Sequence, residues 1–271
     1  MKKITKILGQ TLAVVMVVVT AFLLTACGNE APQRTFVKFN DFGGISGSAG
    51  MDGDSIWHVG GNTYATTNGG SNTYQYDPVD RSWSLTTHIN LPPIETAQGF
   101  NPMNIWYDGT DTYYSYCVTY NQNETPEYRH YKREADGTWS EKKWYNLVEF
   151  EGKNVWSDGE NIYYSCHFNN NLKERQQYVL DRATSTWQPM AWNYLTVFDG
   201  ENIWTDGTDI YYADAFVLDV EKHTWTPKEW PAEVWGDLDP NTMVWSKIWT
   251  DGNNIFYSNK IVSPFQHYIF K

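Results

Sequence analysis

The sequence predicts an all-β protein built from five copies of one structural unit, and three observations lead to this fold class. A pattern of the type "NIWTDGTDIYY" occurs five times, beginning near positions 55, 104, 154, 202 and 247. The copies follow one another at 45 to 50 residues, which is typical of propeller repeats. The strand segments are apolar or aromatic at consecutive positions, as in sheets that are covered on both faces. We therefore predict a five-bladed β-propeller of four-stranded blades over residues 35–271.

The first 26 residues are predicted to be a lipoprotein signal peptide and not part of the fold. Three lysines precede an apolar run from Leu12 to Leu24, which at 13 residues is shorter than the roughly 20 residues that span a bilayer. The sequence "LTAC", which ends at Cys27, resembles a bacterial lipobox. That resemblance implies cleavage before Cys27 and lipidation of its sulfur.

Residues 27–34 are then expected to tether the propeller to a bacterial membrane on its extracytoplasmic side. The seven residues from Gly28 to Arg34 reach at most about 24 Å, so the domain would stay close to the membrane. After removal of the three lysines of the signal peptide, the mature chain contains 17 basic and 32 acidic residues. This charge argues against nucleic acid as a partner.

The missing strand of the last unit is predicted to come from the N-terminus. The fifth unit stops after its third strand, "QHYIFK", while the stretch "RTFVKFNDF" precedes the first unit. Phe36 and Phe39 fall near the place that a tryptophan takes in the fourth strand of other units. We predict that residues 35–40 pair beside residues 267–271 and close the ring, which removes the exposed edge between first and last blades.

The first two strands of a unit are predicted to form a hairpin around Asp-Gly. Such pairs begin at Asp108, Asp158, Asp206 and Asp251. Asp-Gly favours a tight turn whose two central residues have positive φ, which Gly adopts freely and Asp tolerates. Repeated aspartates can bind calcium, but each turn offers only one or two carboxylates without the alternating oxygen ligands of a calcium loop. We therefore predict structural turns, no metal site and no cofactor.

The tryptophans of each unit are predicted to be structural. The fourth strand carries Trp83, Trp139, Trp187 or Trp225. The first strand of every unit carries another, and because an aromatic side chain buries some 150 to 250 Å², these five are expected to pack between blades. They are Trp57, Trp106, Trp156, Trp204 and Trp249.

Two cysteines besides Cys27 leave room for at most one disulfide. Cys117 and Cys166 occupy near-equivalent places in neighbouring units, one residue out of phase. One residue moves a strand side chain to the other face, so two buried thiols are favoured over a bridge.

The segment from Gly69 to Leu85, "GGSNTYQYDPVDRSWSL", resembles a Kelch motif through its double glycine, spaced tyrosines and closing tryptophan. The segments "FVLDVEKHTW" and "YVLDRATSTW" are weaker copies, and the double glycine is missing at this place in the other four units. The resemblance implies a Kelch-like propeller. A second resemblance, through "IWTDG", is to propellers with Tyr-Trp-Thr-Asp repeats.

One face of the predicted ring carries the long loops. The connections from strand two to three and from strand four to the next blade emerge together on what we call the long-loop face. These loops are rich in Asn, Tyr, Trp, Asp and His, which suits a sugar-binding surface. For each loop aromatic, the alternative is packing into the core. The candidate ligand-binding residues are Tyr120, Asn121, His167, Trp235, Asp237 and Trp245.

The sequence gives little support for a catalytic function, and we predict no catalytic residue. The sequence has no HExxH, GxSxG or CxxC motif and no phosphate-binding glycine loop. Glu95, Asp237 and Asp239 would serve glycoside cleavage only if two carboxylates converged at roughly 5 to 9.5 Å. We expect a non-catalytic, monomeric binding module for a glycan or an envelope protein. The alternatives are a carbohydrate-active enzyme of the glycosidase type and a scaffold of an envelope complex.

Overall fold

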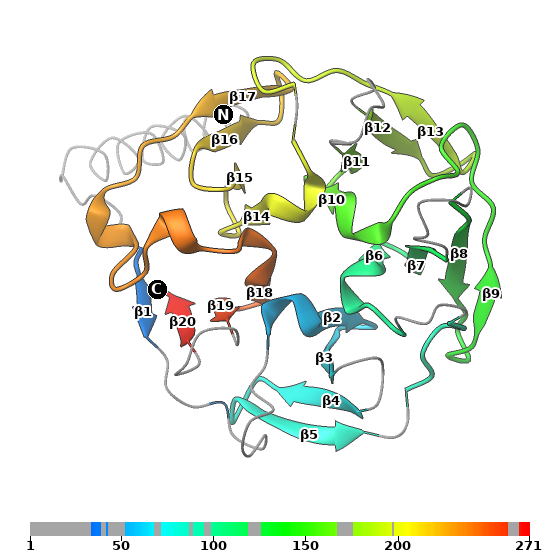
Figure 1. The fold of residues 1–271 in the computed structure, drawn as a ribbon, viewed down its shortest axis with the longest axis horizontal. Helices are drawn as coiled ribbons and strands as arrows, with labels where there is room; N and C mark the ends of the chain where they lie inside the picture. The colour runs from blue at the N-terminus through cyan, green and yellow to red at the C-terminus, as the bar shows by residue number, and fades with distance from the viewer. Residues whose placement is uncertain are drawn as a thin grey trace, which may run out of the picture. The chain divides into compact units, whose positions relative to one another are not determined.

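A computed structural model describes residues 34–38, 42, 52–67, 72–86, 89–94, 99–118, 126–166, 176–196, 198–259 and 266–271. Within the unit Phe36–Lys271, five sheets of four strands stand in a ring, which confirms the predicted five-bladed propeller (Figure 1). Only Arg34 and Thr35 are described in the other unit, Met1–Thr35, so the predicted signal peptide and Cys27 lie outside the described residues. No helix in the described part of the chain is long and apolar enough to cross a membrane.

Each sheet is antiparallel and runs from an inner strand near the central axis to an outer strand at the rim. Blade 1 consists of β2 (Ile56–Val59), β3 (Asn62–Thr67), β4 (Asn72–Asp77) and β5 (Ser82–Thr86). Blade 2 consists of β6 (Ile105–Tyr107), β7 (Thr112–Cys117), β8 (Tyr128–Arg133) and β9 (Trp139–Glu141). Blade 3 consists of β10 (Val155–Ser157), β11 (Ile162–Cys166), β12 (Gln176–Asp181) and β13 (Thr186–Pro189). Blade 4 consists of β14 (Ile203–Thr205), β15 (Ile210–Tyr212), β16 (Phe216–Asp219) and β17 (Thr224–Pro227).

Blade 5 joins the two ends of the chain, as predicted. It consists of β18 (Ile248–Thr250), β19 (Ile255–Asn259), β20 (Gln266–Phe270) and β1 (Phe36–Lys38). In β1, Phe36 pairs with Phe270 and Lys38 with Tyr268. Phe36 is buried and contacts Trp204 of blade 4, with 6.4 Å between ring centroids. It therefore takes the place of an outer-strand tryptophan, while Phe39 lies outside the described residues.

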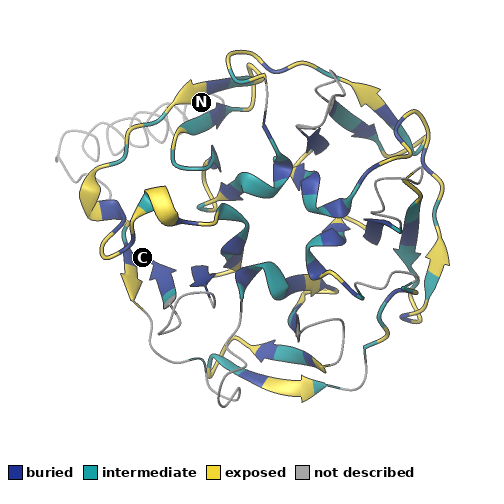
Figure 2. Cartoon of the chain, viewed as in Figure 1, coloured by how far each residue is buried: buried dark blue, intermediate teal, exposed yellow. Residues whose placement is uncertain are grey.

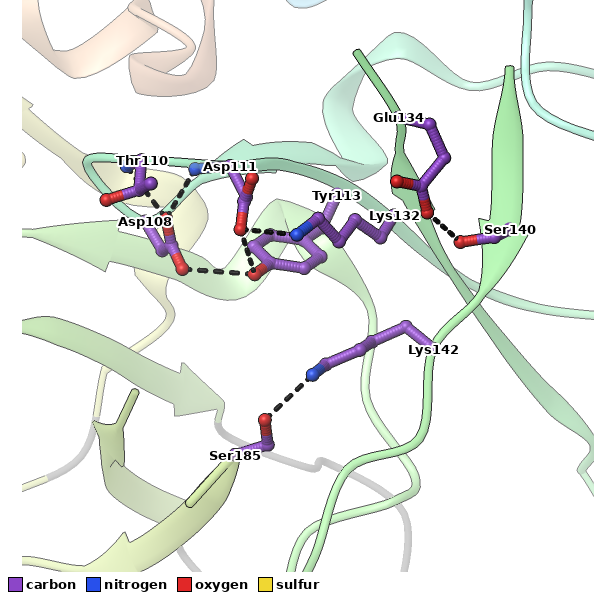
Figure 3. Close-up of polar contacts among 9 residues, drawn as sticks. All are labelled: Asp108, Thr110, Asp111, Tyr113, Lys132, Glu134, Ser140, Lys142 and Ser185. Atoms are coloured by element: carbon purple, nitrogen blue, oxygen red, sulfur yellow. Dashed lines mark hydrogen bonds and ion pairs between the residues drawn. The ribbon is translucent and has the colours of Figure 1, made fainter. Parts of the chain in front are cut away.

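The Asp-Gly hairpins are confirmed, but the predicted turn conformation is wrong for blades 2 to 5. Four residues join the strands there, and the glycine has positive φ (92° at Gly109), whereas no aspartate of the described chain does. The carboxylate of Asp108 accepts the N–H groups of Thr110 at 2.9 Å and Asp111 at 2.7 Å (Figure 3). The aspartate recurs because its side chain closes the turn, and not because it tolerates positive φ.

Blade 1, which has no Asp-Gly pair at this place, forms a tight two-residue turn. Val59 pairs with Asn62 across Gly60 and Gly61, which have φ values of 57° and 76°. Two successive positive φ angles are what a type I′ hairpin requires, and two glycines adopt them without steric cost. The first hairpin of blade 1 has the same length as that of blade 2, because Trp57 pairs with Tyr64 as Trp106 pairs with Tyr113, but it forms one more residue pair next to the turn.

The inner-strand tryptophans pack between blades, as predicted. All five are at most 8% exposed. Trp106 contacts Trp187 of blade 3, and Trp156 contacts Trp225 of blade 4, each with ring centroids 6.0 Å apart. The same contact joins Trp249 of blade 5 to Trp83 of blade 1, with ring centroids 6.0 Å apart.

These tryptophans also find a hydrogen-bond acceptor for the indole N–H within their own blade. In blades 2, 3 and 5 the acceptor is a serine hydroxyl of the second strand. The pairs are Trp106 with Ser115 (3.0 Å), Trp156 with Ser165 (2.9 Å) and Trp249 with Ser258 (3.0 Å). In blade 4, which has Ala213 at this position, the Ala213 carbonyl accepts from Trp204 at 2.8 Å.

Cys117 and Cys166 are buried thiols without a disulfide between them, which agrees with the favoured prediction. They end the second strands of blades 2 and 3. Burial raises the pKa of Cys166 to about 11. This thiol therefore stays protonated and unreactive at neutral pH.

Candidate functional site

A 3₁₀ turn precedes the inner strand of every blade and brings it to the central axis. These turns are η1 (Gly53–Ser55), η3 (Pro102–Asn104), η4 (Gly152–Asn154), η5 (Gly200–Asn202) and η8 (Trp245–Lys247). With the inner strands, which surround the middle of the ring in Figure 2, they line a cavity of about 390 Å³ that we call the channel. The wall of the channel is largely apolar, because the residue after each turn is Ile56, Ile105, Val155, Ile203 or Ile248.

Three of the turns begin with glycine because adjacent turns touch through their backbones. A Cβ atom at any of these glycines would overlap the last carbonyl group of the preceding turn. The pairs are Gly53 with Lys247, Gly152 with Asn104 and Gly200 with Asn154. The mouth of the channel is therefore a rigid ring of backbone.

This mouth lies on the long-loop face and carries charged side chains. Lys247 is 1% exposed and forms ion pairs with Asp52 and, at 3.4 Å, with Asp54. Burial, together with repulsion from Asp52, raises the pKa of Asp54, although Lys247 opposes the shift. On the other side of the ring Lys153 forms an ion pair with Glu201 at 3.6 Å. These pairs join blade 5 to blade 1 and blade 3 to blade 4.

The Lys247 cluster was not predicted from the sequence. Its signal is a break in the repeat, because a lysine stands where the units at Asn104, Asn154 and Asn202 have asparagine. A buried lysine needs a carboxylate partner, and Asp52, at the other end of the ring sequence, supplies one.

A groove beside the channel mouth is the second part of the candidate site. It has a volume of about 760 Å³ and is formed by the connection from blade 4 to blade 5 together with Asp214. Trp230, Trp235 and Leu238 supply apolar surface, and Lys228 places its Nζ atom 4.9 Å from the Trp230 ring centroid. The polar residues around this surface are Asp214, Lys228, Glu229 and Asp239.

Three predicted ligand-binding residues lie in this region. Trp235 lines the groove but is only 6% exposed, because its ring stacks on Phe36 at 6.0 Å. Trp245 is half-buried at the channel mouth, where its ring is parallel to that of Trp204. The rings of Trp235 and Trp245 are 5.8 Å apart, whereas Asp237 is exposed and does not line the groove.

The remaining candidates are residues outside the described chain and Asp239, which lines the groove. Tyr120, Asn121, His167 and Glu95 lie outside the described residues. Asp239 caps the short turn η7 (Pro240–Thr242) by accepting the N–H of Asn241 at 3.0 Å. Within the described ranges, no group of three or more His, Cys, Asp or Glu side chains could hold a metal ion.

No protein-family model matches the sequence, and a search of curated proteins finds no match.

Proposed function

We propose that this protein is a lipid-anchored, extracytoplasmic binding protein that holds a glycan on its long-loop face without chemical change. The observation that carries the proposal is the groove between blades 4 and 5, where two tryptophans lie among four charged side chains. Propellers host many activities, so the proposal rests on this site and not on the fold.

The chemistry of the groove suits a carbohydrate. A sugar presents an apolar C–H face that packs on an aromatic ring, and hydroxyl groups that need charged or polar partners. Trp230, which is half-buried, offers ring surface, and the carboxylates of Asp214 and Glu229 offer acceptors beside it. Because the channel mouth is a closed backbone ring, the groove is held on a rigid support.

The proposal includes a Kelch-like origin and a lipid on Cys27. The "LTAC" stretch and the lysine-rich start support the anchor, and the tyrosines and tryptophan of the segment 69–85 support the Kelch-like character. An envelope protein bound to the same face is the second candidate partner.

Glycan binding is tested with the mature protein on a glycan array, followed by titration of any ligand found. Trp230→Ala is expected to weaken binding at least tenfold, because it removes the most accessible aromatic surface of the groove. Trp139→Ala is the matched control, since this tryptophan is also half-buried but lies on blade 2. An array without specific binding, or equal losses in both variants, would contradict the proposal.

The anchor is tested separately by expressing the full chain with and without Cys27→Ser. The wild-type protein is expected to incorporate radiolabelled palmitate and to partition into the detergent phase. The variant should do neither. A wild-type protein without label would exclude the lipid anchor and leave the glycan proposal standing.

A further inference from the structure

A second pocket lies on the opposite face of the ring, between blades 1 and 2. This face carries the hairpin turns, and we call it the hairpin-turn face. The pocket has a volume of about 680 Å³, within the usual range for small-molecule sites. His58 and the turn at Gly60 and Gly61 form one side, and Tyr107, Thr110 and Asp111 of blade 2 lie among the residues of the other. Three departures from the repeat coincide here.

The first departure is Gly61 in the turn of blade 1. The turns of blades 2 to 5 have the same length but carry a side chain at this place, from Thr110, Glu160, Thr208 or Asn253. A Cβ atom at Gly61 would meet nothing within 4 Å. The missing side chain thus leaves open space on this face.

The second departure is Arg133, which stands opposite Trp139 in the pairing of β8 with β9. The residues that stand opposite the equivalent tryptophans of blades 1, 3 and 4 are apolar or aromatic and buried. They are Tyr76, Leu180 and Leu218. Blade 2 therefore has a guanidinium group at a position where blades 1, 3 and 4 have a buried core side chain.

The third departure is Ala135. By the same register it corresponds to Arg182 of blade 3, whose guanidinium reaches Gly109 of blade 2 and donates to the Glu160 carbonyl. Arg182 thus fills the space between blades 2 and 3. Ala135 is too short to do so between blades 1 and 2, and it lines the pocket.

The charged residues that line the pocket differ in their partners. Asp111 forms an ion pair with Lys132 at 2.7 Å, and Glu134 accepts the Ser140 hydroxyl (Figure 3). Arg133 forms no ion pair with any residue that the structure describes, and its Nε atom is buried without a hydrogen-bond partner there. Because Arg133 also lines the pocket, its guanidinium without an ion pair favours an anionic ligand there.

We propose that this pocket binds a small carboxylate-bearing sugar, such as a hexuronate. The sugar carboxylate would bind the planar guanidinium of Arg133, whose fork of N–H groups matches the two oxygens of a carboxylate. The ring of Tyr107, 53% exposed, lies at the pocket to pack on the sugar, and Thr110 lies there to bond a hydroxyl. Departures from repeat rules are expected at functional positions. This site is independent of the groove on the long-loop face.

The proposal is tested by titrating the detergent-solubilised full chain with D-galacturonate and with neutral D-galactose, using isothermal calorimetry. Galacturonate is expected to bind at least tenfold more tightly than galactose. Arg133→Leu should remove this preference while the protein stays folded, because blade 3 has Leu180 at the same position. Arg182→Leu, the matched control, removes a guanidinium outside the pocket and should leave galacturonate binding unchanged.

A second variant fills the pocket without changing any charged side chain that lines it. Ala135, which is exposed and lines the pocket, is replaced by tryptophan (Ala135→Trp). Galacturonate affinity should fall at least tenfold, with melting unchanged. The proposal is overturned if the wild-type protein shows no saturable galacturonate binding, or if both variants bind as the wild type does.

Discussion

At the scale of single residues, Trp156 and Ser165 show how residues that recur in the repeats make a stabilising contact. The Ser165 hydroxyl accepts the indole N–H of Trp156 at 2.9 Å and donates to Oε1 of Gln177 at 2.6 Å. All three side chains are buried. The serine that follows the tyrosines in "IYYS" therefore recurs because a buried indole N–H requires an acceptor. A ligand is not needed to explain it.

Ser165→Ala should destabilise the protein by about 1 to 3 kcal/mol, because it leaves a buried indole N–H without an acceptor. Ser84→Ala, at an exposed position of β5, is the control and should change stability by less than about 0.5 kcal/mol. The measurement is urea unfolding followed by tryptophan fluorescence. Equal effects of the two substitutions would mean that this hydrogen bond contributes no net stability.

His130 is a buried titratable residue outside both proposed sites. Its ring stacks on Phe150 with centroids 4.4 Å apart, and Nε2 donates to the Val148 carbonyl at 2.8 Å. Burial lowers the pKa of His130 to about 4, although the Val148 carbonyl opposes the shift. Since an unperturbed histidine has a pKa of about 6.5, the unfolded chain takes up a proton first as the pH falls.

The stability that neutral His130 contributes is therefore present above pH 6.5 and is lost as the pH falls toward 4. His130→Phe keeps a ring against Phe150 but cannot titrate. We expect the variant to lose less unfolding free energy than the wild type between pH 7 and pH 4.5, in urea titrations at both pH values. Parallel losses would show that His130 is not linked to folding.

At the scale of elements, the 3₁₀ turns do more than connect strands. They form the inner ring, and their close backbone contacts explain why Gly53, Gly152 and Gly200 recur at the first turn position. The glycines of the hairpin turns have a different role. Gly207 has a φ of 88° and open space around it, so it is needed for conformation alone.

Gly152→Ala should therefore be much more damaging than Gly207→Ala. At Gly152 the new Cβ overlaps the Asn104 carbonyl, and the ring must open to admit it. At Gly207 the cost is that of a left-handed residue, about 1 to 2 kcal/mol. Melting temperatures of the two variants decide between these roles, and a milder effect at Gly152 would refute the close-packed ring.

At the scale of the whole molecule, closure depends on three residues of β1. Their pairing with β20 supplies the outer strand of blade 5, and Phe36 fills the core between blades 4 and 5. The paired partners are more than 200 positions apart in the sequence, so this contact joins the first strand of the ring to the last. It makes all five blades interdependent.

Deletion of residues 35–40 should abolish the soluble monomer. The exposed edge of β20 would be free to pair with another chain, and Trp204 would lose its contact with Phe36. Size-exclusion chromatography of the deletion variant, compared with a Val37→Thr control at an exposed position of β1, measures the effect. A deletion variant that elutes as a monomer with wild-type melting would contradict the closure.

The sequence by itself determined the number of blades, the hairpins, the inner tryptophans and the closing strand. These features are periodic or local, so spacing along the chain reveals them. Local pattern was insufficient even for one turn, because "DG" is compatible both with positive φ at Asp108 and with a carboxylate that closes the turn. Only hydrogen-bond geometry distinguishes these conformations.

Only the tertiary structure decided which side chains could serve a site. Trp235 was a candidate loop aromatic, yet packing against Phe36 from the start of the chain leaves it 6% exposed. The pairing of Lys247 with Asp52 likewise depends on closure of the ring, and the pocket beside Arg133 depends on the contact between blades 1 and 2. Burial, pKa and cavity shape are sums over neighbours in space, and in a ring of blades those neighbours come from different repeats.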